Sequence, residues 1–243
     1  MRSWMGRAVV LGVGVVGTGC FSSKMAQTAE PLGEGMSELA ISFNASQVAN
    51  LAEGGDWAVW PNLLPNIHYG IGLSDSMDFF GNFNFGSSYL ESGVKLALAQ
   101  TDSGTLSILP SAGWAPLGFY SGARFSLPVM YTQRMSPTFA LSLMGTASYQ
   151  MNNAGSSGVF AEIGVASEGD ELGLGGGLGV EFRGRALYVR PSVTYTYYRT
   201  AFSNSGDSTD WSLGQLTFTV GRTGGKTEAQ LDRIEQKLDD LSQ

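Results

Sequence analysis

Few side chains in this chain have the chemistry of a catalytic or metal site. The only histidine is His68, and the only cysteine is Cys20. A zinc site takes several His, Cys or carboxylate ligands, so a histidine without a second ligand does not predict one. A serine hydrolase would combine His68 with a serine and an orienting acid, and nothing in the sequence singles out such a serine. We therefore expect no catalysis, no bound metal and no cofactor.

A glycine-rich run, GLGGGLG at residues 173–179, is the segment that could suggest phosphate binding. A phosphate loop needs a lysine directly after the glycines and a helix that begins there, and neither follows. Glycine within a strand instead permits close packing or the bending that closes a barrel. We interpret residues 173–179 as part of a strand.

The composition of the chain argues against several classes of protein. Only 14% of the residues are charged, which is about half the usual fraction in soluble domains. The chain has 34 glycines without a three-residue period, which excludes collagen. A net charge of −7 argues against a nucleic-acid partner, because such a partner requires basic surface to neutralise phosphate. After the N-terminus no apolar run is long enough for a spanning helix.

The N-terminus has the pattern of an export signal. Arg2 and Arg7 precede the apolar run AVVLGVGVV at residues 8–16, and the small residues GTG then lead to Cys20. This segment resembles the lipobox of bacterial lipoproteins, in which a signal peptidase cuts before a cysteine whose thiol is then acylated. It departs from the family at Gly17, where an aliphatic residue is usual.

The lipobox resemblance implies a signal peptide at residues 1–19 and lipidation of Cys20. Phe21 and Ser22 lack the aspartate that would imply retention in the inner membrane, so the resemblance implies delivery to the outer membrane. The alternative is an ordinary secretory signal that is cut after Ala26 or Ala29 and discards the cysteine. Residues 20–35 are expected to form a linker.

Alternation with a period of two dominates residues 36–222. In MDFFGNFNF, residues 77–85, and in LESGVKLAL, residues 90–98, mostly bulky apolar side chains alternate with polar or small ones. Such alternation predicts strands with one apolar and one polar face. Strands are expected at residues 38–45, 67–73, 77–85, 90–98, 105–114, 120–133, 138–150, 159–166, 172–183, 187–198 and 212–222.

The polar faces of these strands indicate which side points outward. A soluble sheet wets its outer face with Lys, Glu, Asp and Arg, but here the second face is mainly Gly, Ser, Asn, Thr and Ala. The same pattern suits a transmembrane barrel, with the apolar face toward lipid and the small polar face toward the lumen. Aromatic residues that we expect in an interfacial girdle are Tyr69, Phe119, Tyr120, Tyr131, Tyr149, Tyr195, Tyr197 and Trp211.

Two segments carry a family resemblance. IHYGIGLSDSMDFFGNFNFG, residues 67–86, and LESGVKLALAQTDSGTLSILPSAGW, residues 90–114, resemble the repeating hairpins of bacterial outer-membrane β-barrels. The resemblance implies an all-β fold, a closed antiparallel transmembrane barrel of about 10–12 strands, located in the bacterial outer membrane with lipid around it. Such barrels have an even number of strands, and we favour ten because a long connection separates residues 38–45 from the next strand.

The barrel is expected at residues 36–222, and the C-terminal residues 223–243 are expected to form a short amphipathic helix. Thr227 and Gln230 have the spacing of a capping box. The helix presents an apolar face of Leu231, Ile234, Leu238 and Leu241. This face would pack on the barrel itself, on a second copy of the chain or on a periplasmic protein partner.

Strand alternation assigns a mixed set of charged and polar residues to the lumen. A hairpin that turns at RGR, residues 183–185, would bring Glu181 within one register step of Arg190, where opposite charges would pair. In a ten-stranded barrel we expect a nearly filled lumen with a thin channel at most. The predicted lumen or pore-lining residues are Glu38, His68, Asp78, Glu91, Lys95, Arg124, Glu162, Glu181, Arg183 and Arg190.

These elements leave several functions open. The first is an outer-membrane barrel that acts as a small porin-like channel, with passage graded by lumen size and charge, or as a structural component of that membrane. The alternative is a non-channel outer-membrane lipoprotein that serves interaction, assembly or adhesion through its loops and C-terminal helix. A third class is a soluble lipoprotein built on a β-sandwich.

Overall fold

The structure is a computed structural model that describes residues 26–50, 58–85, 89–115, 122–152, 170–184, 187–202 and 210–225. These residues form a single antiparallel sheet that closes into a barrel. Its strands are β1 (Ser37–Asn50), β2 (Ala58–Ser74), β3 (Met77–Asn84), β4 (Tyr89–Gln100), β5 (Gly104–Ile108), β6 (Ser111–Ala115), β7 (Gly122–Ser136), β8 (Phe139–Asn152), β9 (Asp170–Arg183), β10 (Leu187–Phe202) and β11 (Asp210–Gly224). No helix in the described part of the chain is long and apolar enough to cross a membrane.

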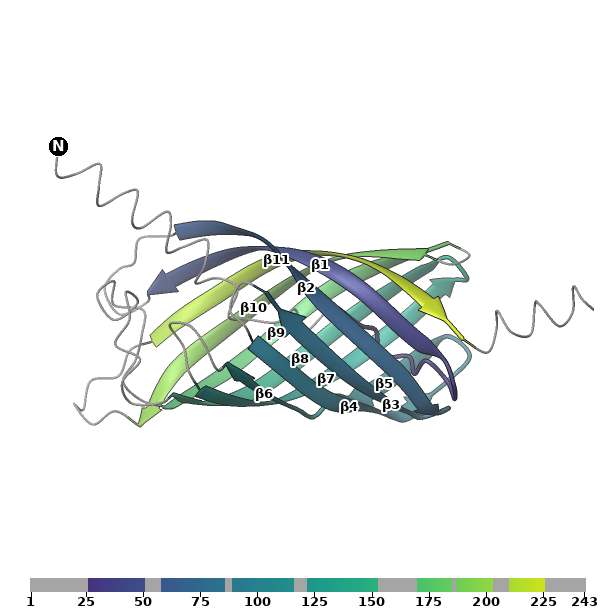
Figure 1. Cartoon of the computed structure of the whole chain (residues 1–243), viewed down its shortest axis with the longest axis horizontal. Coiled ribbons are helices and arrows are strands. Elements are labelled where there is room, and N and C mark those ends of the chain that lie inside the picture. The colour runs from purple at the N-terminus through teal and green to yellow at the C-terminus, as the bar shows by residue number, and fades with distance from the viewer. Residues whose placement is uncertain are drawn as a thin grey trace, which may run out of the picture.

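The barrel closes between its first and last strands. β1 pairs with β11 along its whole length, from Ser37 opposite Gly224 to Asn50 opposite Trp211, and Figure 1 shows the two strands side by side. With the short strands β5 and β6 counted as one, every other strand pairs with its neighbours in the sequence, so the topology is an up-and-down meander. Because the first and last strands pair, the sheet has no exposed edge. A sheet inside a membrane must be closed in this way, since lipid cannot hydrogen-bond to unpaired backbone groups.

β5 and β6 together make one strand of the barrel. Ile108 of β5 lies opposite Val129 and Ser111 of β6 lies opposite Ser126, so the register on β7 continues across the gap. The interruption falls at Pro110, whose backbone has no N–H to donate to a neighbouring strand. The barrel therefore has ten strands around its circumference, which confirms the predicted closed antiparallel barrel and the even count.

The reason that we gave for ten strands was wrong. We set residues 38–45 apart because of the connection that follows them, but β1 is a full member of the sheet and pairs with both β11 and β2. The predicted strand at residues 159–166 lies outside the described residues. The predicted strand at residues 105–114 corresponds to β5 and β6 together.

Side chains alternate between a polar interior and an apolar exterior. On β9, Leu172 and Leu174 are exposed while Glu171 and Gly173 are buried, and the same pattern holds on β3 and β7. Outward-facing Leu174 is 65% exposed and Leu216 is 61% exposed, whereas inward-facing Arg190 is 1% exposed. This inside-out arrangement is the one that the sequence pattern predicts, and it is typical of a barrel surrounded by lipid.

The aromatic residues divide between the two faces. Tyr69, Tyr131 and Tyr195 are exposed on the outer surface. Trp211, which we placed in the same outer girdle, is 1% exposed and lies on the inner face of β11, so that prediction was wrong. Phe119 and Tyr120 lie outside the described residues.

The two ends of the barrel differ in the length of their connections. At the end that we call the turn end, two or three residues join β2 to β3, β4 to β5, β7 to β8 and β9 to β10. At the opposite end, the loop end, residues 153–169 and 203–209 separate consecutive strands and lie outside the described residues. β1 begins and β11 finishes at the turn end. The predicted helix face, from Leu231 to Leu241, and Cys20 also lie outside the described residues.

Candidate functional site

The lumen contains a segment that does not belong to the wall. Residues 26–33, which we call the lumenal segment, precede β1, and Ala26 to Ala29 at its start are buried. The sequence predicted residues 20–35 as a linker. In the structure the lumenal segment instead contacts the inner faces of β3, β4, β5, β7 and β10.

Main-chain atoms of the lumenal segment make most of its contacts with β4, β5 and β7. The N–H of Ala29 donates to Oγ1 of Thr132 at 2.9 Å, and its carbonyl accepts from Ser107 at 2.5 Å. Nζ of Lys95 donates to the carbonyl of Thr28 at 3.3 Å and to that of Glu30 at 2.8 Å. These bonds hold the segment against three adjacent strands of the wall.

Two further contacts fix the ends of the lumenal segment. The N–H of Leu32 donates to both carboxylate oxygens of Asp78 at 3.0 Å. At the other end, Arg190 of β10 donates to the carbonyl of Ala26. The segment therefore reaches from β3 to β10 inside the barrel.

One side-chain ion pair and one apolar cluster complete the attachment. Glu30 accepts two bonds from the guanidinium of Arg134, one of them from Nε at 2.8 Å, and both side chains are partly exposed. Ala29 packs into a cluster of inward-facing apolar side chains, which are Phe80, Leu109, Met130 and Met144. The small methyl group of Ala29 fits beside these larger side chains.

The wall around the lumenal segment carries paired charges, which we call the ionic layer: Glu38, Asp78, Lys95, Glu181 and Arg190. All five are at most 4% exposed. Lys95 lies 2.8 Å from Asp78, and Arg190 lies 3.8 Å from Glu38. Pairing is expected, because a buried charge without a partner is costly.

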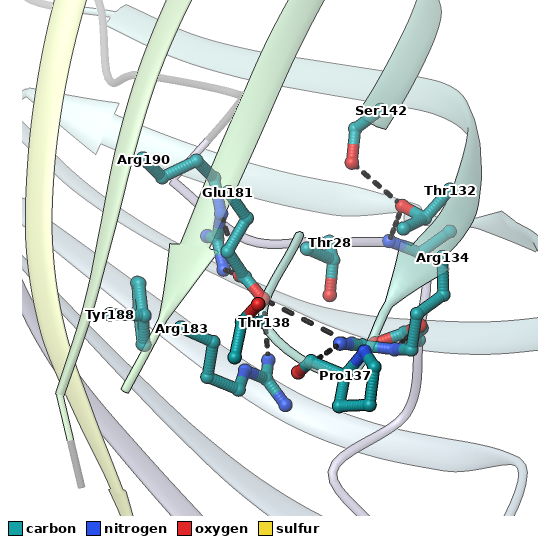
Figure 2. A network of polar contacts seen from close by, with 12 residues as sticks. Thr28, Thr132, Arg134, Pro137, Thr138, Ser142, Glu181, Arg183, Tyr188 and Arg190 are labelled. Carbon is teal, nitrogen blue, oxygen red and sulfur yellow. Dashed lines mark hydrogen bonds and ion pairs between the residues drawn. The ribbon is translucent and has the colours of Figure 1, made fainter. Parts of the chain in front are cut away.

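Glu181 and Arg190 are brought together. Arg190 donates to Glu181 from Nε at 3.2 Å and also from Nη2. The flanking pairs, Val189 opposite Phe182 and Ser192 opposite Gly179, place the two residues directly opposite each other rather than one register step apart. Figure 2 shows Glu181 between Arg190 and Arg183, with Arg134 approaching from β7.

His68 belongs to a hydrogen-bonded chain inside the wall. Its Nδ1 lies 2.6 Å from Oδ1 of Asn82, whose amide nitrogen donates to Glu91 at 3.2 Å. Glu91 also accepts from Ser111 at 2.7 Å. On the other side, Nε2 of His68 lies 3.7 Å from Glu38. Within the described ranges no group of three or more His, Cys, Asp and Glu side chains could hold a metal ion.

Nearer the loop end the lumen contains an aromatic cluster with two charged residues. The rings of Tyr198 and Trp211 stack with centroids 4.1 Å apart. Arg124 donates to the hydroxyl of Tyr198 at 2.9 Å, and the indole N–H of Trp211 donates to Glu171 at 3.0 Å. Sequence alternation assigned Arg124 to the lumen, but it did not identify the aromatic residues that hold it.

Between these layers lies a neutral polar surface. The amide–hydroxyl patch consists of Ser42, Asn44, Asn66, Ser192 and Thr219, all at most 4% exposed. Their hydroxyls and both atoms of each side-chain amide have no hydrogen-bond partner in the structure. The predicted lumen residues were charged side chains and His68, so this uncharged patch was missed. The period of two that places Glu38 and Arg190 in the lumen also places Ser42, Asn44 and Ser192 there.

The remaining predicted residues are placed as follows. Asp78, Glu91 and Lys95 are buried on the inner faces of β3 and β4. Arg183 is partly exposed at the turn end, 2.9 Å from Glu181. Glu162 lies outside the described residues.

No protein-family model and no curated protein matches this chain. Among solved structures, the chain is similar to an outer membrane channel from Pseudomonas putida F1, with 11% identity, a TM-score of 0.48 and coverage of 81% of this chain and 98% of that chain. It is also similar to the attachment invasion locus protein Ail of Yersinia pestis, with 12% identity, a TM-score of 0.34 and coverage of 79% and 99%. Neisserial surface protein A is similar at 13% identity, with a TM-score of 0.39 and coverage of 78% and 99%.

Proposed function

We propose that this protein is a small channel of the bacterial outer membrane whose turn end is closed by its own lumenal segment. The closed ten-stranded sheet and the exposed leucines of its outer face support insertion in a membrane. The short connections at the turn end suit the periplasmic side, because barrels of this class have short periplasmic turns.

One observation carries the channel proposal: an element separable from the wall fills the turn end of the lumen. The segment is held through the main-chain atoms of Ala26, Thr28, Ala29, Glu30 and Leu32. The ion pairs of the wall, Lys95 with Asp78 and Arg190 with Glu181, do not need it. The barrel can therefore keep its structure when the segment leaves, and departure of the segment opens the turn end.

The inner wall on the side of β8 to β10 supports a path for solute. Apart from Met144, its inward side chains between the two charged ends are small, namely Ser142, Thr146, Ser148, Gly173, Gly175, Gly177, Gly179, Ser192, Thr194 and Thr196. Side chains of this size do not reach far from the wall of a ten-stranded barrel, whose interior is wider than that of an eight-stranded one. The filling at the turn end therefore depends on the lumenal segment.

Deletion of residues 27–33 tests this function. In planar lipid bilayers the deletion variant should show sustained openings, whereas the full-length protein should stay mostly closed. Heat-dependent gel mobility should show that both proteins are folded barrels. A folded deletion variant that never conducts would rule out the channel. The role in interaction or adhesion depends on loops and a helix outside the described residues.

We also propose that the signal is cut before Cys20 and that Cys20 is acylated. The lumenal segment supports this site, because cleavage after Ala29 would remove the Ala26 carbonyl that Arg190 binds, the Thr28 carbonyl that Lys95 binds and the Ala29 methyl group that packs on Met130. Cleavage before Cys20 retains all of these groups. Mass spectrometry of the mature N-terminus should find an acylated Cys20, and a mature chain beginning at Gln27 or Glu30 would contradict the proposal.

A further inference from the structure

The amide–hydroxyl patch is one continuous surface of the inner wall. Ser42 on β1 lies opposite both Thr219 on β11 and Asn66 on β2. Thr217 lies opposite both Asn44 on β1 and Ser192 on β10. Four adjacent strands thus bring the unpaired groups together.

The unpaired groups of this patch require partners. Buried polar groups in folded proteins are almost always hydrogen-bonded, and a buried group without a partner costs free energy. In the described structure, Asn44 and Asn66 each leave both the donor and the acceptor of the amide unpaired, and Ser42, Ser192 and Thr219 leave their hydroxyls unpaired. A molecule in the lumen, either water or a solute, must supply the missing hydrogen bonds.

The chemistry of the patch selects a neutral partner. Amide and hydroxyl groups offer donors and acceptors but no charge. The charged side chain of Arg190, which lies opposite Thr219, is already paired with Glu181 and Glu38. A charged solute would lose hydration here without gaining a counter-charge. A sugar or polyol, whose hydroxyls both donate and accept, matches the patch.

We infer that the amide–hydroxyl patch binds a small neutral polyhydroxylated solute, of the size of a monosaccharide or sugar alcohol, inside the lumen. This inference deepens the proposed channel function, on which it rests, by naming the class of solute. Asn44 and Asn66 determine specificity, because each of them can accept a hydrogen bond from one hydroxyl and donate one to another. The ionic layer below takes no part in recognition, since its charges pair within the wall.

Binding can be measured without any conductance. Glucose and the similarly sized anion gluconate serve as probes for saturation-transfer difference NMR on the full chain folded in detergent micelles. Glucose should give a saturable signal, and gluconate should bind at least about tenfold more weakly, which corresponds to 1.4 kcal/mol.

The double variant Asn44→Leu with Asn66→Leu removes both amides and keeps the branching and the number of heavy side-chain atoms. It should weaken glucose binding at least about tenfold, since each lost hydrogen bond contributes roughly 1 kcal/mol. Ser126→Ala is the matched control, because its hydroxyl is also buried and unpaired but lies on β7, across the barrel from β1. This control should bind glucose as the unmodified protein does. Heat-dependent gel mobility checks that all three proteins are folded.

Three results would overturn the inference: no glucose signal from the unmodified protein, equal binding of glucose and gluconate, or unchanged glucose binding in the double variant. The first and third mean that water alone occupies the patch. The conductance test separates this inference from the channel proposal. If the deletion variant conducts but the protein shows no specific glucose binding, only the inference about the solute is refuted. If glucose binding depends on the two amides but the barrel never conducts, only the channel proposal is refuted.

Discussion

The ionic layer and the amide–hydroxyl patch line the same lumen, but the polar groups are paired in the first and unpaired in the second. In the ionic layer Lys95 is paired with Asp78, and Arg190 with Glu181. In the patch, Asn44 and Asn66 have no partner in the described structure. A buried charge is far more costly to leave unpaired than a buried amide. The difference indicates that the charges stabilise the barrel, whereas the neutral groups are available to a solute.

The largest effect on stability is expected from Arg190→Ala. The substitution leaves Glu181 and Glu38 buried with fewer partners and removes a contact to Ala26. Breaking a buried pair in this way should lower the free energy of unfolding by about 3–5 kcal/mol. Urea titration of the barrel in lipid vesicles, followed by tryptophan fluorescence, measures this loss.

Arg199→Ala is the matched control for that measurement. Arg199 lies on the same strand near the loop end and is exposed, so its loss should change stability by no more than about 0.5 kcal/mol. Equal effects of the two substitutions would show that the ionic layer does not stabilise the barrel. Arg190→Lys, which keeps the charge, should fold even if Arg190→Ala does not.

A smaller effect is expected from Glu30→Ala, which acts on the closure of the lumen. The Glu30 and Arg134 side chains are each about one fifth exposed, so their pair contributes about 1 kcal/mol and is screened by salt. Because the closed state would lose this stabilisation, the open probability in planar bilayers should rise about fivefold.

Glu34→Ala serves as the control for this second prediction. Glu34 is exposed and follows the lumenal segment in the sequence, so its removal should leave the open probability unchanged. The fivefold difference between the variants should shrink at high salt. A Glu30→Ala protein that opens as rarely as the Glu34→Ala protein would show that this ion pair does not hold the segment.

The smallest effect on stability is expected in the amide–hydroxyl patch. Asn44→Leu replaces an unpaired buried amide by an apolar side chain of similar size, and such a change is close to neutral or stabilising. The free energy of unfolding should stay within about 1 kcal/mol of the original or rise. A loss as large as that of Arg190→Ala would show that Asn44 supports the fold and is not available to a solute.

The sequence predicted the wall of the barrel more fully than its contents. Alternation identifies the inward face of a strand, so Glu181 and Arg190 could be placed together from the RGR turn and the period of two. Trp211 was misplaced because its position near a strand end also suits an interfacial aromatic residue, and only the register of β11 shows that it points inward.

The lumenal segment could not be predicted from the residue types alone. Ala26, Thr28 and Ala29 bind mainly through their carbonyl and N–H groups, which every non-proline residue possesses. A polar linker and a segment bound in this way therefore have similar sequences. Glu30 and Ala29 contribute the side-chain contacts, and each is too common a residue type to identify a partner by itself.

Closure of the lumen by residues 26–33 is most directly tested by a reversible cross-link. The N–H of Ala29 lies 2.9 Å from Oγ1 of Thr132, so Ala29→Cys with Thr132→Cys, in a Cys20→Ala background, should form a disulfide that mass spectrometry can verify. We predict that the oxidised protein stays closed in planar bilayers and that adding a reductant produces channel openings in the same preparation. Identical conductance before and after reduction would contradict this account of the closed lumen.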